Sequence, residues 1–133
     1  MGSEMCIRDS TTSEVEKVYE ILWYATDAGI NAAKPGASTF DIFNAMNKII
    51  SDGNAVGNNV GRLGHGLGLQ LTEPPSHRPG DNTLIKENMV LTIEPGMEYV
   101  QGKMIVHEEN VVIRKDGAEL ITKRAPKEIP IIK

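Results

Sequence analysis

The sequence has a single cysteine, no long apolar run and no cluster of basic residues, and each absence excludes a class of protein. With Cys6 alone, no disulfide can form within the chain, and a zinc site built from several cysteines is excluded. No apolar stretch approaches the roughly 20 residues that a membrane-spanning helix requires, so we expect no membrane association. Lysine and arginine are scattered and the net charge is −4, which argues against nucleic-acid binding.

What remains is the composition of one globular domain: 133 residues, of which 40% are hydrophobic and 24% are charged. The first ten residues differ, because they show neither a helical nor a strand period, nor the layout of a signal peptide. Within them, Met5–Ser10 resembles translated sequencing-adapter DNA. We therefore expect residues 1–10 to be non-native or disordered, residues 11–133 to form the domain, and the natural protein to continue upstream.

Two amphipathic helices are predicted in the N-terminal half, over residues 14–33 and 39–51. In both segments apolar side chains recur at three- and four-residue spacing. Thr12 precedes acidic residues at the start of the first helix, and Ser38 with Asp41 resembles a capping box at the start of the second. Such helices typically pack against a core, so we assign them no role in binding.

Strands and turns are predicted for the rest of the chain. A hairpin turn is expected at Asp116-Gly117, and the tail, residues 123–133, is expected to be an extended surface segment because it contains prolines. Two helices followed by strands predict an α+β fold, with two helices against a curved antiparallel sheet. The predicted strands are residues 89–94, 103–106, 110–114 and 119–122.

One histidine and two glutamates recur in strand-like settings and together indicate a metal site. His65 lies in Gly-His-Gly-Leu-Gly, Glu94 ends an apolar segment before Pro-Gly, and Glu108 belongs to His-Glu-Glu-Asn. Imidazole and carboxylate groups are the ligands that hard and borderline divalent metals prefer. Plainer interpretations exist, with His65 as a turn residue and Glu94 as a strand-end side chain that reaches solvent or pairs with an arginine.

Glu108 and Glu109 are neighbours on a predicted strand, so their side chains point to opposite faces. At most one of them reaches a cleft, and the other is expected to face water or to form a salt bridge. Their own pattern does not choose between them.

The three motifs in this order, followed by Asp-Gly-Ala-Glu-Leu-Ile-Thr, resemble the pita-bread metallohydrolases. This family includes methionine aminopeptidase, Xaa-Pro aminopeptidase, prolidase and the metal-free creatinase, and the Xaa-Pro aminopeptidase and prolidase branch is the most similar. The resemblance covers residues 13–122 and implies the C-terminal part of a pita-bread fold. The implied activity is metal-dependent hydrolysis of peptide-like C–N bonds, as in an Xaa-Pro aminopeptidase or dipeptidase.

The resemblance also implies two divalent metal ions, manganese, cobalt, iron or zinc, held by two Asp, one His and two Glu. The His corresponds to His65 and the two Glu to Glu94 and Glu108. His65 and Glu94 would also serve catalysis, with Glu94 as a proton shuttle. In the family the two Asp lie upstream of the helix that begins near Ser13 here, so we expect this chain to be a fragment that is inactive alone. A small peptide or amide substrate and a cytoplasmic homodimer are further implications.

Three positions depart from the family pattern: Thr72 and Gly61 stand where these peptidases carry histidine, and Val106 stands where they carry arginine. We expect Thr72, Arg62 and His107 to bind substrate. Thr72 would donate a hydrogen bond and Arg62 would anchor a carboxylate, although a surface salt bridge suits Arg62 as well. His107 or His77 would compensate for the missing histidines, and His107 is the candidate that we assign to the site.

Because threonine cannot carry positive charge, the residue at position 72 favours a second class of enzyme on the same fold. That class is a creatinase-like amidinohydrolase or a lyase. A third interpretation is a binding protein that kept the fold and lost the chemistry. His77, between Pro75 and Pro79, is expected to be an exposed loop residue.

Overall fold

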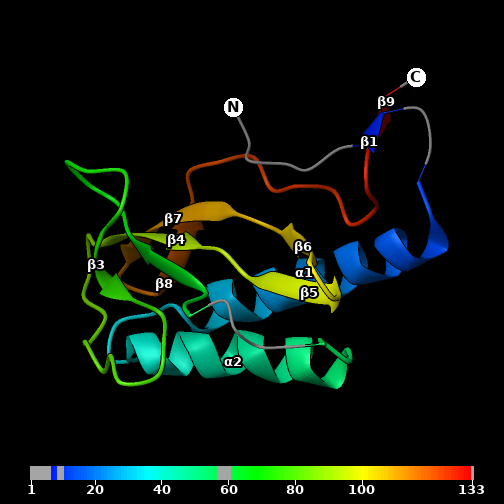
Figure 1. Cartoon of the computed structure of the whole chain (residues 1–133). Helices are drawn as coiled ribbons and strands as arrows, with labels where there is room; N and C mark the ends of the chain where they lie inside the picture. The colour runs from blue at the N-terminus through cyan, green and yellow to red at the C-terminus, as the bar shows by residue number, and fades with distance from the viewer. Residues whose placement is uncertain (1–6, 9–10, 57–60, 133) are drawn as a thin grey trace.

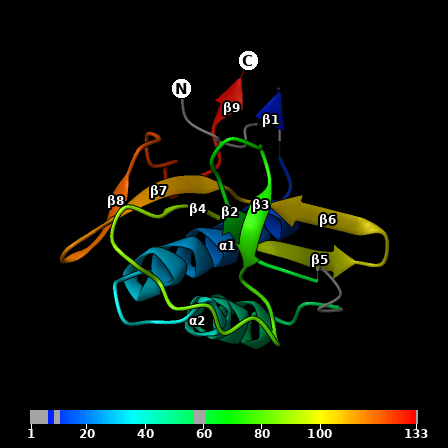
Figure 2. The same ribbon diagram turned by 90° about the vertical axis from the view of Figure 1, so that its left-hand side faces the viewer.

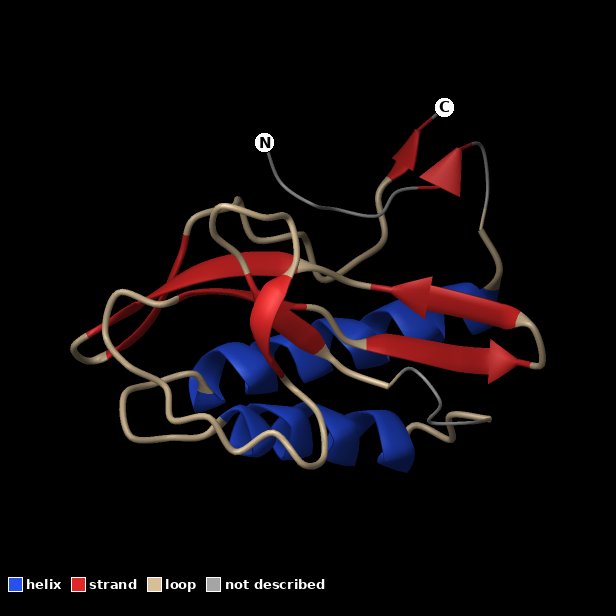
Figure 3. Ribbon diagram, turned by 60° about the vertical axis from the view of Figure 1, so that its left-hand side comes forward, coloured by secondary structure: helices blue, strands red, loops and turns tan. Residues whose placement is uncertain are grey.

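The fold has two layers, with both helices on one side of the strands (Figure 1, Figure 3). The computed structural model describes residues 7–8, 11–56 and 61–132. Helix α1 spans Ser13–Ala32, helix α2 spans Thr39–Asp52, and the two pack against each other. The predicted α+β arrangement of two helices against an antiparallel sheet is confirmed.

Both helices begin within one residue of the predicted positions, because their start signals are local. At α1 the Thr12 hydroxyl accepts a hydrogen bond from the backbone N–H of Val15 at 3.2 Å. At α2 the Ser38 N–H donates to the Asp41 carboxylate at 2.8 Å, and the Asp41 N–H donates to the Ser38 hydroxyl at 3.1 Å. These caps satisfy N–H groups that the first helical turn leaves unpaired.

The strands, in chain order, are β1 (Ile7–Arg8), β2 (Gly64–Gly66), β3 (Glu73–Ser76), β4 (Val90–Ile93), β5 (Gly96–Val100), β6 (Lys103–Val106), β7 (Glu109–Arg114), β8 (Gly117–Leu120) and β9 (Ile131–Ile132). The main sheet is antiparallel, with five strands in the order β3-β2-β4-β7-β8. β5 and β6 form a separate hairpin. β1 and β9 pair in parallel, at the opposite end of the molecule from α2 (Figure 2).

The predicted strands at 89–94, 103–106 and 110–114 correspond to β4, β6 and β7. β8 begins at Gly117, earlier than predicted, because Lys115 and Asp116 suffice for the turn. The predicted strands do not include β1, β2, β3, β5 or β9. β3 contains Pro74 and Pro75, which lack N–H donors, and β5 starts at Gly96 directly after Pro95, so local composition argues against both strands.

The core lies between the helices and the helix-facing side of the strands. Gly29 brings α1 close, because a Cβ at this position would lie 2.7 Å from the Met46 sulfur and 2.8 Å from Ile93 Cγ2. Ile93 therefore points toward α1, and the next residue, Glu94, projects from the opposite face. The fully buried apolar side chains include Leu22, Ile42, Met46, Ile50, Leu63, Leu91, Ile93 and Ile113.

The C-terminal tail differs from the predicted surface segment, because part of it is packed onto α1. Ala125 and Ile129 are 2% and 8% exposed. The Tyr19 hydroxyl donates to the Pro126 carbonyl at 2.7 Å, and Trp23 Nε1 donates to the Ala125 carbonyl at 2.9 Å. Both contacts join residues about a hundred positions apart in sequence, which local patterns do not report.

The prediction for residues 1–10 falls largely outside the described residues. Within that segment the structure describes Ile7–Arg8 alone, which form β1 beside β9. Over the described parts of the chain, neither helix has the length and apolar character that crossing a membrane demands.

His77 is fully buried, contrary to the exposed loop position expected for it. Pairing of β3 with β2 carries it inside, since its backbone exchanges hydrogen bonds with Leu63 and Gly64. Its Nε2 lies 3.1 Å from the Thr92 carbonyl oxygen. Burial lowers the pKa of His77 to about 4, because the charged imidazolium loses its hydration there.

We expect the burial of His77 to make the folded chain less stable as the pH falls. The unfolded chain protonates this residue near pH 6.5, whereas its pKa in the folded chain is about 4. Between these values the unfolded state binds more protons, so lowering the pH favours unfolding. Because of His77, the free energy of unfolding should fall by about 2 kcal/mol between about pH 7 and about pH 5.

Urea unfolding at the two pH values, in wild type and in His77→Gln, measures this contribution. The variant should show a weaker pH dependence by that amount, whatever its own stability. An identical pH dependence in both proteins would contradict the prediction.

Candidate metal centre

The structure brings the three predicted metal ligands to one cavity of about 300 Å³. His65 reaches it from β2, Glu94 from the residue after β4, and Glu108 from the residue before β7. The three residues lie within 43 positions of one another in the sequence. They lie on or directly beside three neighbouring strands of one sheet, β2, β4 and β7. The cavity is also lined by Arg62, Leu67, Leu71, Thr72 and Asn110.

The strand register places Glu94 opposite Glu108. The β4–β7 and β5–β6 ladders join end to end in one register, with these two residues in the connection between them. The His107 N–H donates to the Pro95 carbonyl at 2.9 Å and holds that connection together. Partners across antiparallel strands project from the same face, so the two carboxylates face the cavity together.

His65 presents one ring nitrogen to this pair. Its Nδ1 lies 2.8 Å from the Gly66 carbonyl oxygen, and its Nε2 lies 3.4 Å from Glu94 Oε2. A carbonyl only accepts, so the hydrogen bond places a ring proton on Nδ1 and leaves Nε2 as the ring nitrogen that faces the carboxylate. This is how metal-binding histidines are commonly oriented, with the second nitrogen fixed by a backbone oxygen.

Glu108 and Glu109 face opposite sides of the strand, as predicted. Glu109 is fully buried on the helix side, whereas Glu108 is half-buried and lines the cavity. Burial, and then the negative charge of Glu94, raise the pKa of Glu108. Two like charges held together in this way attract a cation.

The chain matches the family model described as metallopeptidase family M24 over residues 4–115. This chain belongs to the M24 family. It is 34% identical over 122 residues to an Xaa-Pro dipeptidase of Lactobacillus delbrueckii subsp. lactis, an alignment that covers 91% of this chain and 33% of that protein. It is 33% identical over 114 residues to an Xaa-Pro dipeptidase of Pyrococcus furiosus, covering 86% of this chain and 33% of that protein.

Solved structures of M24 proteins share the fold. A prolidase from Pyrococcus furiosus superimposes with a TM-score of 0.80 at 33% identity, over 86% of this chain and 34% of that one. An Xaa-Pro dipeptidase from Bacillus anthracis superimposes with a TM-score of 0.86 at 25% identity, over 96% of this chain and 34% of that one. The predicted resemblance is confirmed, and the chain spans about a third of the length of the curated relatives it matches.

The donors of this M24 chain fit part of a divalent-metal site. Two carboxylates face one another, and an imidazole with its other nitrogen already occupied stands beside them. Over the described residues, no three His, Cys, Asp or Glu side chains converge closely enough to enclose an ion. The three side chains therefore form an open, incomplete set of donors.

Of the residues expected to bind substrate, Arg62 and Thr72 line the M24 cavity and His107 does not. His107 is 1% exposed, and its Nδ1 lies 2.9 Å from the Thr26 hydroxyl oxygen on α1. It points to the helix side because it is the strand neighbour of Glu108. The structure thus assembles five of the six residues predicted for the site.

Asn110 is the polar lining residue that the sequence analysis missed. Its Oδ1 accepts a hydrogen bond from the Thr92 hydroxyl at 2.8 Å, which fixes the side-chain amide. The two-residue spacing from Glu108, which puts both side chains on one face of the strand, is the signal that could have indicated it.

Proposed function

We propose that this M24 chain carries part of the active centre of a metal-dependent hydrolase that cleaves Xaa-Pro dipeptides. The observation that supports the proposal most is the facing pair of Glu94 and Glu108, with His65 Nε2 directed at Glu94. Relatives of similar sequence are named Xaa-Pro dipeptidase. The substrate would be a small peptide, and a cytoplasmic homodimer stays a prediction from the resemblance.

His65, Glu94 and Glu108 would hold the metal ions in this proposal, together with the two upstream Asp that the resemblance implies. Two divalent ions, manganese, cobalt, iron or zinc, supply acidification of a water molecule and polarisation of the scissile carbonyl. Glu94 Oε2 would accept the proton of the attacking water and return it to the leaving amine. Glu108 would act as a metal ligand and would take no part in the proton transfer. His65 would keep its Nε2 directed at the centre through the Nδ1 contact with Gly66.

Arg62 and Thr72 would bind the substrate in the same cavity. The Arg62 guanidinium suits the carboxylate of a dipeptide, because it forms paired hydrogen bonds with planar anions. Thr72 would donate a hydrogen bond to the peptide carbonyl.

Hydrolysis of Leu-Pro tests the proposal. The chain would be assayed alone and joined to the protein sequence encoded upstream of Thr11 in its gene, each after chelation and after addition of Mn²⁺. We expect metal-dependent hydrolysis in the longer protein and little in the chain alone. Absence of metal-dependent hydrolysis in both would reject the proposal.

Thr72 favours a second function, that of a creatinase-like amidinohydrolase. It stands where M24 peptidases of this branch are expected to carry histidine, so restoring the histidine tests the choice between the two functions. We expect Thr72→His to raise kcat for Leu-Pro about tenfold or more, because it restores a donor that carries charge near the developing oxyanion. Thr72→Ser, which keeps the hydroxyl, should leave kcat near the wild-type value.

Wild type, Thr72→His and Thr72→Ser, each in the longer protein, would be assayed at steady state on Leu-Pro and on creatine. These assays distinguish the dipeptidase from the amidinohydrolase and from a binding protein. If Thr72→His gains nothing while wild type hydrolyses creatine, the amidinohydrolase alternative is correct. If neither substrate reacts in any protein, the binding alternative is favoured.

A further inference from the structure

The side chain next to the proposed ligand Glu108 is a buried carboxylate whose partners all come from one segment of the tail. Glu109 is 0% exposed. It accepts hydrogen bonds from the Ala125 N–H at 2.8 Å and from the Thr122 hydroxyl at 2.7 Å. The Arg124 guanidinium lies at salt-bridge distance, 3.7 Å. We call residues 122–126 the C-terminal strap.

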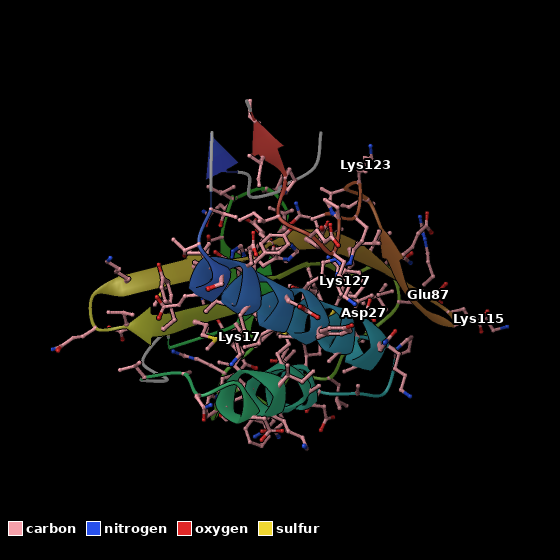
Figure 4. The ribbon with its side chains drawn as sticks, turned by 90° about the vertical axis from the view of Figure 1, so that its right-hand side faces the viewer. Lys17, Asp27, Glu87, Lys115, Lys123 and Lys127 are labelled. Atoms are coloured by element: carbon pink, nitrogen blue, oxygen red, sulfur yellow. The ribbon has the colours of Figure 1, made fainter. Side chains whose placement is uncertain are left out.

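The strap packs on α1 and forms hydrogen bonds with it. Figure 4 shows this side of the molecule, with Lys123 and Lys127 of the tail and Asp27 of α1 labelled. Arg124 donates to the Trp23 carbonyl at 2.9 Å, and its guanidinium stacks 4.3 Å from the centre of the Trp23 ring. Trp23 Nε1 donates back to the Ala125 carbonyl. The strap therefore gives Glu109 partners that cannot move independently of α1.

Glu108 needs such support because it lies where the strand is interrupted. β6 ends at Val106 and β7 begins at Glu109, so Glu108 falls between the two ladders. A slip or rotation of the strand by one residue would exchange the faces of all its side chains. With Glu109 held toward α1, its neighbour is directed into the cavity.

A structural role alone does not account well for a carboxyl group that is fully buried at position 109. A buried carboxyl group loses its hydration even when it is paired, and an apolar residue of similar size often stabilises as well. A carboxyl group with two hydrogen-bond donors and an arginine at salt-bridge distance does what an apolar side chain cannot, because it fixes both the orientation and the rotation of the strand.

We propose that Glu109 and the C-terminal strap are a positioning device for Glu108, with Glu109 as the positioning residue and Arg124 as its support. The inference rests on the proposed function, in which Glu108 is a metal ligand. It assigns no contact with metal or substrate to Glu109 or to Arg124.

The test measures Co²⁺ binding by calorimetry and by the visible absorption of the bound ion, in wild type, Glu109→Gln and Arg124→Met. Both variants should bind Co²⁺ about 10- to 100-fold more weakly, the loss typical of residues that orient a ligand, with an altered visible spectrum. Lys127→Met is the matched control, because it removes the ion pair between the tail and Glu20 of α1, at 3.9 Å, without removing a partner of Glu109. It should bind Co²⁺ as wild type does.

Wild-type affinity and spectrum in Glu109→Gln and Arg124→Met would overturn the inference and leave the proposed function standing. Equal weakening in Lys127→Met would also overturn it, since the effect would then come from loosening the tail. If neither the chain nor the longer protein of the hydrolysis assay binds Co²⁺, the proposed function fails on its own. The inference is then decided by nuclear Overhauser contacts between Glu94 and Glu108 in the metal-free chain: their loss in Glu109→Gln supports it, and their persistence overturns it.

Discussion

Replacing Gly64 with alanine is expected to destabilise the fold by about 4 kcal/mol or more, enough to unfold much of the chain. Gly64 has a φ of +135°, which side chains of L-residues rarely adopt. A Cβ there would also overlap the Thr92 carbonyl oxygen and the His77 ring. Both obstacles are rigid, because the first is backbone of β4 and the second is a buried side chain. Backbone strain and steric overlap of the Cβ therefore both destabilise the variant, at the residue before the proposed ligand His65.

Gly102→Ala is the matched control for this prediction. Gly102 has a φ of +79°, but nothing lies within 4 Å of a Cβ there. We expect about 1 kcal/mol of destabilisation from the backbone alone. Urea unfolding of both variants measures the difference. A Gly64→Ala chain as stable as Gly102→Ala would show that β2 does not approach β4 and His77 as closely as described.

Replacing Glu94 with glutamine is expected to lower kcat for Leu-Pro about a thousandfold in protein that shows the metal-dependent activity. Glutamine keeps the size of the side chain but cannot accept a proton, and it binds a divalent cation less well than a carboxylate does. General-base catalysis alone is worth about 10²- to 10⁴-fold. Because substrate contacts are left in place, KM for Leu-Pro should change little.

Glu87→Gln controls for the loss of one negative charge, since Glu87 is exposed and does not line the cavity (Figure 4). It should leave kcat unchanged. Steady-state kinetics at saturating Mn²⁺ compares the two variants. If Glu94→Gln kept more than about a tenth of the wild-type kcat, Glu94 could not be the proton shuttle, and another base would have to be sought.

The helices were predictable because their signals are local. Thr12, Ser38 and Asp41 act within one turn, and the apolar period continues over each helix. β3 and β5 were not predictable in this way, since their prolines and glycine argue against strands and only pairing with β2 and β6 makes them strands.

The assembly of the cavity depends on register, which no local pattern reports. The opposition of Glu94 and Glu108 results from two ladders that share a register across a break. Alternation along the strand predicted that the side chains of Glu108 and Glu109 point to opposite faces. The choice of Glu108 as the metal ligand rested on the family resemblance. The buried position of His77 and the attachment of the strap to α1 depend on contacts between distant segments, so sequence patterns gave the wrong environment for both.

The most direct test of the metal centre is nitrogen NMR of the histidine side chains during titration with Zn²⁺. The chain has three histidines, so each ring can be assigned. We predict that Nε2 of His65 shifts on Zn²⁺ binding while its Nδ1 stays protonated, and that His77 and His107 keep their resonances because both are buried away from the cavity. A titration that leaves His65 unchanged, or that shifts His77 or His107 instead, would contradict the proposed metal centre.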